Sequence, residues 1–469
     1  MANGKKIPID PIGRAKKVTR PEINVNNTRY RIKIKKPDRD KRLAAKKLKI
    51  KKYSILFAIT FTVIASTVAL IQTSSAYKLY KLYKGCSNTS YIVGFQNNAE
   101  LRPTGGFWGS FAFVEIPSSI RKTQIIFETN PYKNSNKVEK EADVLLPEPM
   151  QQIWKGKSQS FVNANWSPDF PQSAKTIQWY FGQGWNKSSN GVIAVSSLSV
   201  IDLLKLTGPI EMEDRTLITS ENFSRIMSQK IDTEYWFQEE NHLINEPKTI
   251  IKDLFPIFIE KTKKVPPLKL FKFLHDQLKS NRILVYLNNP KDQSIIKDLG
   301  ISGEILPYEI DYLYVNSTNL AGEKTSLNVT QKTKYSVKNE NNAYIGKLKI
   351  TRSHIPNIWP THPNKNYTRV FVPLGSKIVK AKLDEKDILS QIDQSEEYGR
   401  SVFGFWFSTD PGQTMTAEFV YELPFTLESQ HDYKITVQKQ PGTLPEDIDL
   451  NLPNKKIIRQ QFDESKIEL

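Results

Sequence analysis

Hydrophobic residues fall into short runs along most of the chain, with one long uninterrupted run near its start. Residues 53–72, YSILFAITFTVIASTVALIQ, contain no charged side chain. Twenty residues in a helix rise about 30 Å, which matches the hydrocarbon thickness of a bilayer. The pattern therefore predicts one N-terminal transmembrane helix over 53–72. The stretch KKLKIKK (46–52) abuts this segment, and flanking positive charge marks the cytoplasmic side. We therefore expect a single-pass membrane protein whose N-terminus is cytoplasmic and whose body is extracytoplasmic.

A cleaved signal peptide is the alternative, because Ser74-Ser75-Ala76 resembles a cleavage site. However, the charged leader before the apolar run is much longer than the n-region of a signal peptide. The pattern thus favours a retained anchor. The linker 73–88 contains Tyr77, Tyr80 and Tyr83 at a spacing of three. This spacing suits a short juxtamembrane helix with aromatic rings at the bilayer interface, and it suits an ordinary amphipathic linker equally.

Between residues 89 and 305, compact apolar runs alternate with amphipathic segments. The runs predict buried strands at 91–95, 107–116, 123–128, 191–195 and 282–287. Helical periodicity is found between them, for example in SLSVIDLLKLT (197–207), which Gly208-Pro209 should terminate. This alternation indicates an α/β (or α+β) domain over 89–305.

The pattern changes near residue 306. Short segments of alternating hydrophobicity follow one another to residue 437, for example DYLYVNSTNL, TRVFVPLG and TAEFVYELP. They predict an all-β, sandwich-like domain over 306–437. Residues 438–469 are rich in polar residues and proline, and we expect them to form a loosely structured C-terminal tail.

The net charge of +18 is distributed unevenly along the 469 residues. Residues 1–52 hold 19 basic and four acidic side chains, whereas the remaining 417 residues hold 48 and 45. The first segment therefore predicts a disordered basic cytoplasmic tail whose partner is the lipid bilayer. The body is nearly neutral and has no basic stripe with interleaved aromatic residues, so we expect no nucleic-acid partner.

Few residue types in the chain point to catalysis. The single cysteine, Cys86, excludes an internal disulfide and is either a lone thiol or a site for pairing with a second copy. The five histidines are scattered without ligand spacing. No zinc-protease, phosphate-loop or serine-hydrolase motif is found in the sequence.

The remaining candidate site is NNAELRPTGGFWGSF (97–111), which holds three of the 21 glycines of the chain. In one interpretation, Thr104, Gly105, Gly106 and Gly109 present backbone N–H groups to an anion beside Arg102. Glu100 then orients Arg102 or helps to bind a cation. In the other interpretation, the stretch is a tight turn between two core strands, and Arg102 is a buried strut paired with Glu100 or Asp169. The spacing alone slightly favours the turn.

The order of several stretches resembles a bacterial membrane-protein family known as domain of unknown function 4012. The stretches are QNNAELRPTGGFWGSF, NANWSPDFPQSA (163–174), NGVIAV (190–195), LLKLTGPI (203–210) and DYLYVNSTNLAGEKT (311–325). The chain is also distantly similar to the LytR-CpsA-Psr family of transferases. That similarity implies a phosphotransferase acting on a polyprenyl-pyrophosphate-linked glycopolymer and cell-wall glycan. It also implies that Arg102 binds the pyrophosphate, with Glu100 and Asp169 as ligands of a magnesium ion or as catalytic bases.

Two function hypotheses follow from these observations. In the first, an envelope protein binds and transfers a lipid-linked glycopolymer through its α/β domain. In the second, the chain is a non-catalytic surface scaffold or adhesion module that binds glycan or protein through its β domain. A cleft lined by Arg102, Glu100 and Asp169 would favour the first hypothesis, and a sealed Arg102 the second.

Overall fold

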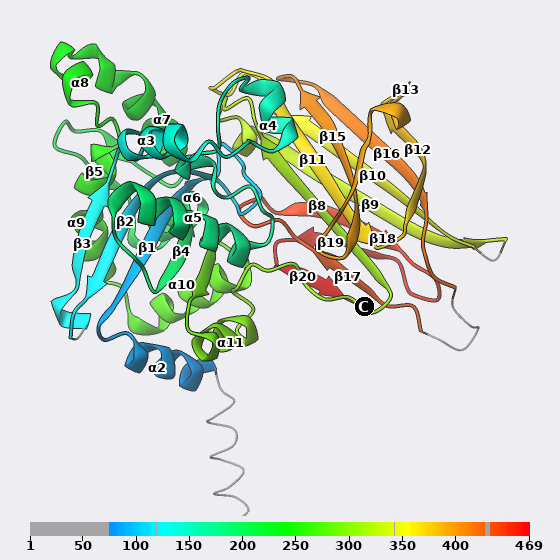
Figure 1. Ribbon diagram of the computed structural model, residues 1–469, viewed down its shortest axis with the longest axis horizontal. Helices are drawn as coiled ribbons and strands as arrows, with labels where there is room; N and C mark the ends of the chain where they lie inside the picture. Colours follow the sequence, from blue (N-terminus) through cyan, green and yellow to red (C-terminus); the bar gives the residue numbers. More distant parts are fainter. Residues whose placement is uncertain (1–74, 119, 342, 427–431) are drawn as a thin grey trace, which may run out of the picture. The chain divides into compact units, whose positions relative to one another are not determined.

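The computed structural model describes residues 75–469, except residue 119, residue 342 and residues 427–431 (Figure 1). The predicted basic tail (1–52) and the predicted membrane helix (53–72) lie outside the described residues. Among the helices of the described part, none is both long enough and apolar enough to cross a membrane.

The first described element is helix α2 (Ser75–Gly85), where the tyrosine spacing predicts a short helix. It contacts helix α11 (Pro290–Asp298), because Lys78 Nζ lies 3.1 Å from Asp298 Oδ2. Cys86, directly after α2, is a free thiol. Its Sγ donates to the carbonyl oxygen of Leu82 at 3.0 Å.

The α/β part is built around a five-stranded sheet in the order β3-β2-β1-β4-β7. Strands β1 and β4 are parallel, and the other neighbouring pairs are antiparallel. The strands coincide with the five predicted apolar runs: β1 (Thr89–Asn97), β2 (Phe107–Ile116), β3 (Gln124–Glu128), β4 (Gly191–Ser196) and β7 (Ile283–Leu287). A separate two-stranded ribbon is formed by β5 (Ile210–Glu211) and β6 (Leu217–Ile218).

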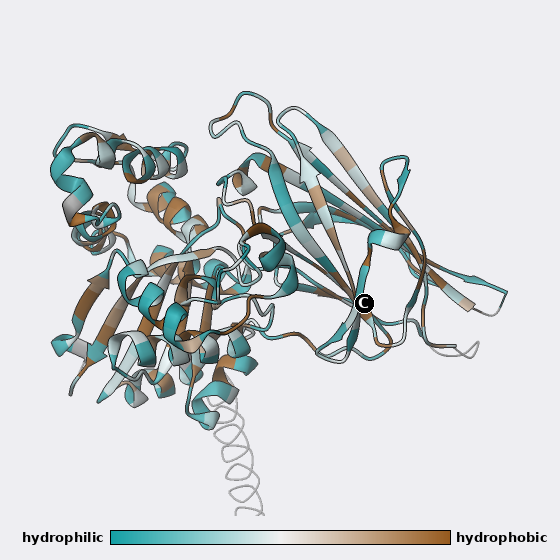
Figure 2. Cartoon of the chain, turned by 45° about the horizontal axis from the view of Figure 1, so that its top comes forward, coloured by the Kyte–Doolittle hydropathy of each residue, from teal (hydrophilic) through white to brown (hydrophobic). Residues whose placement is uncertain are grey.

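Helices cover this sheet because its strands carry apolar residues on both faces. One core joins Ile92 and Val192 to α3 (Tyr132–Ala142) and α5 (Phe170–Trp185). A second core joins α6 (Ser197–Thr207), α7 (Phe223–Asp232) and α9 (Thr249–Thr262). In Figure 2, hydrophobic residues are concentrated on the strands of this sheet. The remaining helices are α4 (Glu148–Ile153), α8 (Glu239–Ile244) and α10 (Pro267–Lys279).

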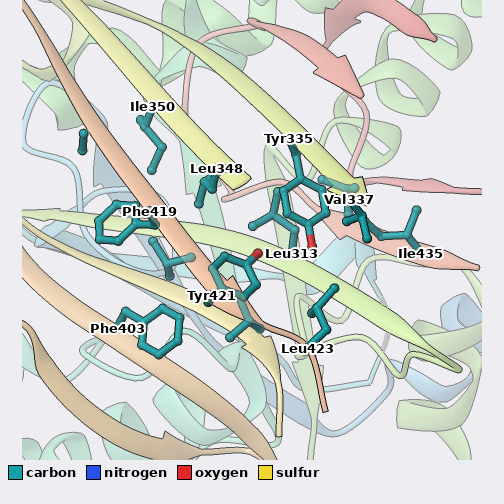
Figure 3. Close-up of a cluster of buried hydrophobic side chains, with 14 of the residues drawn as sticks. Leu313, Tyr335, Val337, Leu348, Ile350, Phe403, Phe419, Tyr421, Leu423 and Ile435 are labelled. Carbon is teal, nitrogen blue, oxygen red and sulfur yellow. The ribbon is translucent and has the colours of Figure 1, made fainter. Parts of the chain in front are cut away.

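The β-rich part consists of two sheets that share one hydrophobic core (Figure 3). The first has the order β13-β12-β16-β10-β9-β18-β19, and the second β14-β15-β11-β8-β17-β20. Tyr335, Leu348 and Phe419 of the first sheet join Leu313 and Phe403 of the second in this core. The strands are β8 (Asp311–Asn319), β9 (Val329–Glu340), β10 (Ala343–His354), β11 (Asn364–Pro373), β12 (Lys377–Leu383), β13 (Lys386–Asp387), β14 (Asp393–Glu397), β15 (Arg400–Thr409), β16 (Thr414–Glu422), β17 (Ile435–Gln438), β18 (Glu446–Asn451), β19 (Ile458–Phe462) and β20 (Lys466–Glu468).

A mixed α/β part followed by β-rich sheets is therefore confirmed, but the expectation of a loosely structured tail over 438–469 is wrong. Strand β18 pairs in parallel with β9, and β20 pairs with β17. The physical reason is burial, because Leu450 and Phe462 are 0% and 1% exposed in the shared core. The described chain belongs to one compact unit, Ser74–Leu469, which contains all of these cores. A fragment that starts at Ser75 therefore keeps all of the described cores.

Candidate ligand-binding cleft

A cleft of about 560 Å³ opens where the parallel strands β1 and β4 end. Phe95, Gln96 and Asn97 from the end of β1 line it together with Val195 at the end of β4. In α/β sheets, ligands commonly bind in the crevice outside the carboxyl ends of the strands. The volume lies within the range of small-molecule sites.

Most of the cleft wall is apolar. Helices α6, α7 and α9 line it with side chains at the spacings of three, four and seven that place residues on one helix face: Val200, Phe223, Met227, Ile231, Ile251, Leu254, Phe255 and Phe258. Such a wall is suited to a hydrocarbon chain, because burial of apolar surface is favourable and needs no directional partner.

One end of the cleft is charged. Arg102, Lys248 and Lys324 line it together with Glu100 and Asp232. Arg102 Nη2 donates to Glu100 Oε1 at 2.6 Å, and Lys324 forms an ion pair with Asp232. Three cations thus face two carboxylates, and Lys248 forms no ion pair among the described residues. The cleft is therefore amphipathic, with a cationic excess at one end.

Arg102 is almost fully enclosed, with an exposed fraction of 2%. The centre of its guanidinium lies 5.3 Å from the ring centre of Phe107 and 5.4 Å from that of Trp154. In the part of the chain that the structure describes, its Nε and Nη1 atoms have no hydrogen-bond partner. Buried donors are nearly always satisfied, so an unsatisfied pair in a cleft wall points to a missing acceptor.

Lys248 immediately precedes α9, and its amine donates to the carbonyl oxygen of Gly109. Its Nζ also lies 5.6 Å from the ring centre of Phe107 and 5.4 Å from that of Tyr132. Burial lowers the pKa of Lys248 to about 8, and the charge of Lys324 acts in the same direction, whereas Glu100 and Asp232 oppose it. Removal of an ammonium from water disfavours its charged form. An anion in the cleft would restore part of the lost stabilisation.

The glycines of the 97–111 stretch serve mainly to let the backbone fold tightly. The Gly105 N–H donates to the carbonyl oxygen of Arg102 at 2.9 Å, and its φ of +127° suits glycine. A Cβ at Gly106 would lie 2.6 Å from backbone atoms of Asn97, and one at Gly109 would lie 2.5 Å from Lys248 Nζ. Gly109 alone of the three glycines lines the cleft. Thr104 is fully buried and accepts a hydrogen bond from Gln96 at 2.8 Å. The contacts of Thr104, Gly105 and Gly106 are therefore those of a tight turn.

Asp169 is not brought to the cleft among the described residues. It is the N-cap of α5, where Oδ1 accepts the Gln172 N–H at 3.1 Å and Oδ2 accepts the Ile305 N–H at 3.0 Å. Its predicted place beside Arg102 is therefore wrong, because the carboxylate satisfies backbone donors instead.

The residues at the cleft do not fit a magnesium ion well. Glu100 is engaged by Arg102, and the described residues contain no group of three or more acidic, histidine or cysteine side chains that could hold a metal.

Sequence reasoning missed Lys248, Lys324 and Asp232. They come from three segments that lie far from residues 97–111 in the chain and have no distinctive spacing. Lys324 does lie in the stretch DYLYVNSTNLAGEKT, which supports the family resemblance. Its proximity to Asp232 could not be read from that stretch.

Comparison with known families identifies the region that builds this cleft. Residues 87–231 match the family described as "Protein of unknown function (DUF4012)". This chain carries a DUF4012 region. The DUF4012 region includes β1, β4, α6 and almost all of α7, together with Glu100 and Arg102, whereas Lys248 and Lys324 lie beyond it. The description assigns no activity.

No curated protein matches the chain. Among solved structures, one from Legionella pneumophila described as a nutrient binding protein is similar to 27% of this chain and 51% of its own, at 9% identity and a TM-score of 0.21. An M1 zinc metallopeptidase from Deinococcus radiodurans matches over 31% of each chain, at 11% identity and a TM-score of 0.14. Yeast LTA4 hydrolase in complex with bestatin matches over 29% of this chain and 26% of its own, at 10% identity and a TM-score of 0.14. The chain thus spans about half or less of these proteins, and such weak likenesses carry no functional argument.

Proposed function

We propose that this protein binds a lipid with a phosphate-bearing head group in the cleft at the ends of β1 and β4. The head group contacts Arg102, Lys248 and Lys324, and the hydrocarbon chain lies between α7 and α9. We further propose that the predicted helix over 53–72 anchors the chain in the bacterial membrane with its body outside. A polyprenyl phosphate or diphosphate that carries envelope polymer is the ligand class that fits this chemistry and the family resemblance.

The observation that carries this proposal is the pair of unsatisfied donors on Arg102. Nε and Nη1 are buried in the wall of the cleft and lack an acceptor in the described part of the chain. Different oxygens of a phosphate-bearing group can accept from these two donors, because a charge-assisted hydrogen bond from a guanidinium to a phosphate is strong. Nearby Lys248 and Lys324 supply the further positive charge that a diphosphate requires.

The apolar wall distinguishes a lipid from a free phosphate compound. The side chains of α7 and α9 on the cleft are apolar over two turns of each helix. A free sugar phosphate or nucleotide would leave this wall exposed to water, whereas a polyprenyl chain would cover it. Binding is thus the activity that the geometry supports. Transfer of the bound group stays a prediction, and so does the alternative of a scaffold that acts through the β-rich part.

The experiment measures binding of farnesyl diphosphate to the soluble fragment 75–469 by isothermal titration calorimetry. Arg102→Ala should weaken binding at least tenfold, since the loss of charge-assisted hydrogen bonds to a phosphate costs more than about 1.4 kcal/mol. Arg459→Ala is the matched control, because the Arg459 side chain is 74% exposed and lies outside the cleft. Equal binding by the wild-type fragment and Arg102→Ala would exclude this arginine from the site.

A further inference from the structure

A basic helical hairpin lies at one edge of the α/β sheet and presents apolar side chains to solvent. It consists of the end of α9, the turn 263–266 and helix α10. On α10, Leu268, Phe271 and Leu274 are 79%, 59% and 43% exposed. Their spacing of three places them in one stripe on the helix surface. The side of α10 that contains the buried Gln277 faces the protein.

Lysines surround this stripe. Residues 260–279 contain six lysines and two carboxylates. The two carboxylates are already paired, Glu260 with Lys263 at 2.5 Å and Asp276 with Lys272 at 2.8 Å. An apolar stripe flanked by lysines is the signature of a helix that lies in the interface of a membrane.

Sheet topology places this hairpin at the edge where the described chain begins. Strand β1 starts at Thr89, four residues after α2, and runs parallel to β4. Strand β7 is antiparallel to β4, so Leu287 lies opposite Gly191 at this edge, and Ile283 lies opposite Val195 at the other. Helix α10 ends three residues before Ile283 at the far edge. Lys261, just before α10, donates to the carbonyl oxygen of Thr207 at the end of α6, the helix that returns from the far edge after β4. The start of α10 therefore lies toward the edge where β1 starts. Figure 1 shows α2, α10 and α11 together at that end of the sheet.

The uncharged segment 53–72 precedes α2 by two residues. A bilayer that holds this segment therefore lies within a few residues of the same edge. Helix α9 links the edge to the cleft, because Lys248 precedes it at the charged end and Phe258 lines the cleft one turn before its end. The apolar wall thus runs from the charged end toward the hairpin.

We infer that the hairpin 260–279 is a membrane-contact surface, with Leu268, Phe271 and Leu274 in the interface and the lysines against anionic phospholipid. This contact orients the protein so that the apolar end of the cleft faces the bilayer. This is a second point of membrane contact, independent of the 53–72 segment. It requires neither the ligand nor the charged end of the cleft.

The test measures co-sedimentation of the fragment 75–469, which lacks the predicted anchor, with phosphatidylcholine vesicles that contain phosphatidylglycerol. The double variant Leu268→Ser, Phe271→Ser should reduce the bound fraction about tenfold. Val379→Ser, Ile457→Ser is the matched control, because both side chains are 53% exposed in the β-rich part. Phosphatidylglycerol should increase the bound fraction of the wild-type fragment. The double variant Lys263→Glu, Lys264→Glu should abolish this increase, whereas the double variant Lys332→Glu, Lys334→Glu on β9 should retain it.

Two readouts make the result decisive. Thermal unfolding should show that the α10 variant is folded, and its binding of farnesyl diphosphate without vesicles should equal that of wild type. No binding of the wild-type fragment to the vesicles would overturn the inference, as would equal losses in the control variants. Wild-type self-association that the α10 variant abolishes, without vesicle binding, would also overturn it and assign the stripe to a second copy of the chain.

Discussion

Arg102 donates from Nη2 to Glu100 Oε1 at 2.6 Å, while its Nε and Nη1 have no partner among the described residues. Glu100 is itself 7% exposed. The arginine is therefore both a strut that neutralises a buried carboxylate and a candidate ligand-binding group. The two roles have different experimental consequences.

For the strut role, Arg102→Ala should lower the free energy of unfolding by about 3 kcal/mol, because it leaves the Glu100 carboxylate buried without a counter-charge. The double variant Glu100→Gln, Arg102→Met should recover part of this stability and still fail to bind farnesyl diphosphate. Urea denaturation and calorimetry on the same samples separate the two effects. Recovery of both stability and binding in the double variant would contradict the ligand-binding role.

For the hydrocarbon part of the ligand, affinity should rise with chain length. Isopentenyl diphosphate should bind at least a hundredfold more weakly than farnesyl diphosphate, since each additional buried CH₂ contributes about 0.8 kcal/mol. Met227→Trp, which narrows the cleft at α7, should reduce this difference. Titration calorimetry with the two compounds measures it. Equal affinities would indicate a site for the phosphate alone.

Lys248 should make both stability and binding depend on pH. Its pKa of about 8 in the folded state lies below the usual value of about 10.4. Between these values the unfolded chain binds more protons, so the free energy of unfolding should increase with pH in this window, by up to about 3 kcal/mol. Binding of farnesyl diphosphate should instead weaken as pH rises through 8, because the amine loses its charge.

Lys248→Met should remove both pH effects, and Lys347→Met, at an exposed lysine of β10, should leave them unchanged. Urea denaturation between pH 7 and pH 10.5 and calorimetry at pH 7 and pH 9 provide the data. A wild-type free energy of unfolding that decreases with pH over this window would contradict the lowered pKa of a buried Lys248.

Backbone packing in the 97–111 stretch predicts opposite effects for two glycines. Gly106→Ala should destabilise the fold by more than about 2 kcal/mol, because the new Cβ would lie 2.6 Å from backbone atoms of Asn97. Gly182→Ala in α5 should stabilise it by about 0.5 kcal/mol, because the nearest atom is 3.8 Å away and alanine favours helix. Thermal unfolding of both variants measures the difference. A neutral Gly106→Ala would show that the turn is looser than described.

The C-terminal strands give a further test of the fold. Leu450→Ala should cost about 2 to 5 kcal/mol, as large-to-small changes in a core do, because Leu450 is fully buried in the shared core. Ile457→Ala, at a residue 53% exposed, should stay within about 0.5 kcal/mol of wild type. Equal stabilities of the two variants would restore the expectation of a loosely structured tail.

Local patterns predicted much of the fold. The run 107–116 coincides with β2, and Gly208 follows α6 with a φ of +80°. By contrast, the segments EDIDLN (β18) and IRQQF (β19) are polar and short. They form strands because β18 pairs with β9 and because side chains of both segments pack into the shared core. That information is tertiary. The pairing of Gly442 with residues 97–111 is also tertiary, because Asn98 Nδ2 donates to the Gly442 carbonyl at 3.1 Å across 344 positions.

The candidate site was predicted in part. The sequence singled out Glu100, Arg102 and Gly109, and the cleft is lined by all three. It misplaced Asp169, although an aspartate directly before Phe-Pro is also a typical helix N-cap signal. It could not find Lys248 or Lys324, because side chains that meet only through folding leave no local pattern.

The most direct test of the central claim is a crystal structure of the fragment 75–469 with farnesyl diphosphate. We expect phosphate oxygens within about 3 Å of Arg102 Nε and Nη1, with Lys248 Nζ close to the same group and the farnesyl chain between α7 and α9. Ligand density elsewhere on the molecule, or Arg102 donors satisfied by other protein groups beside an empty cleft, would contradict it.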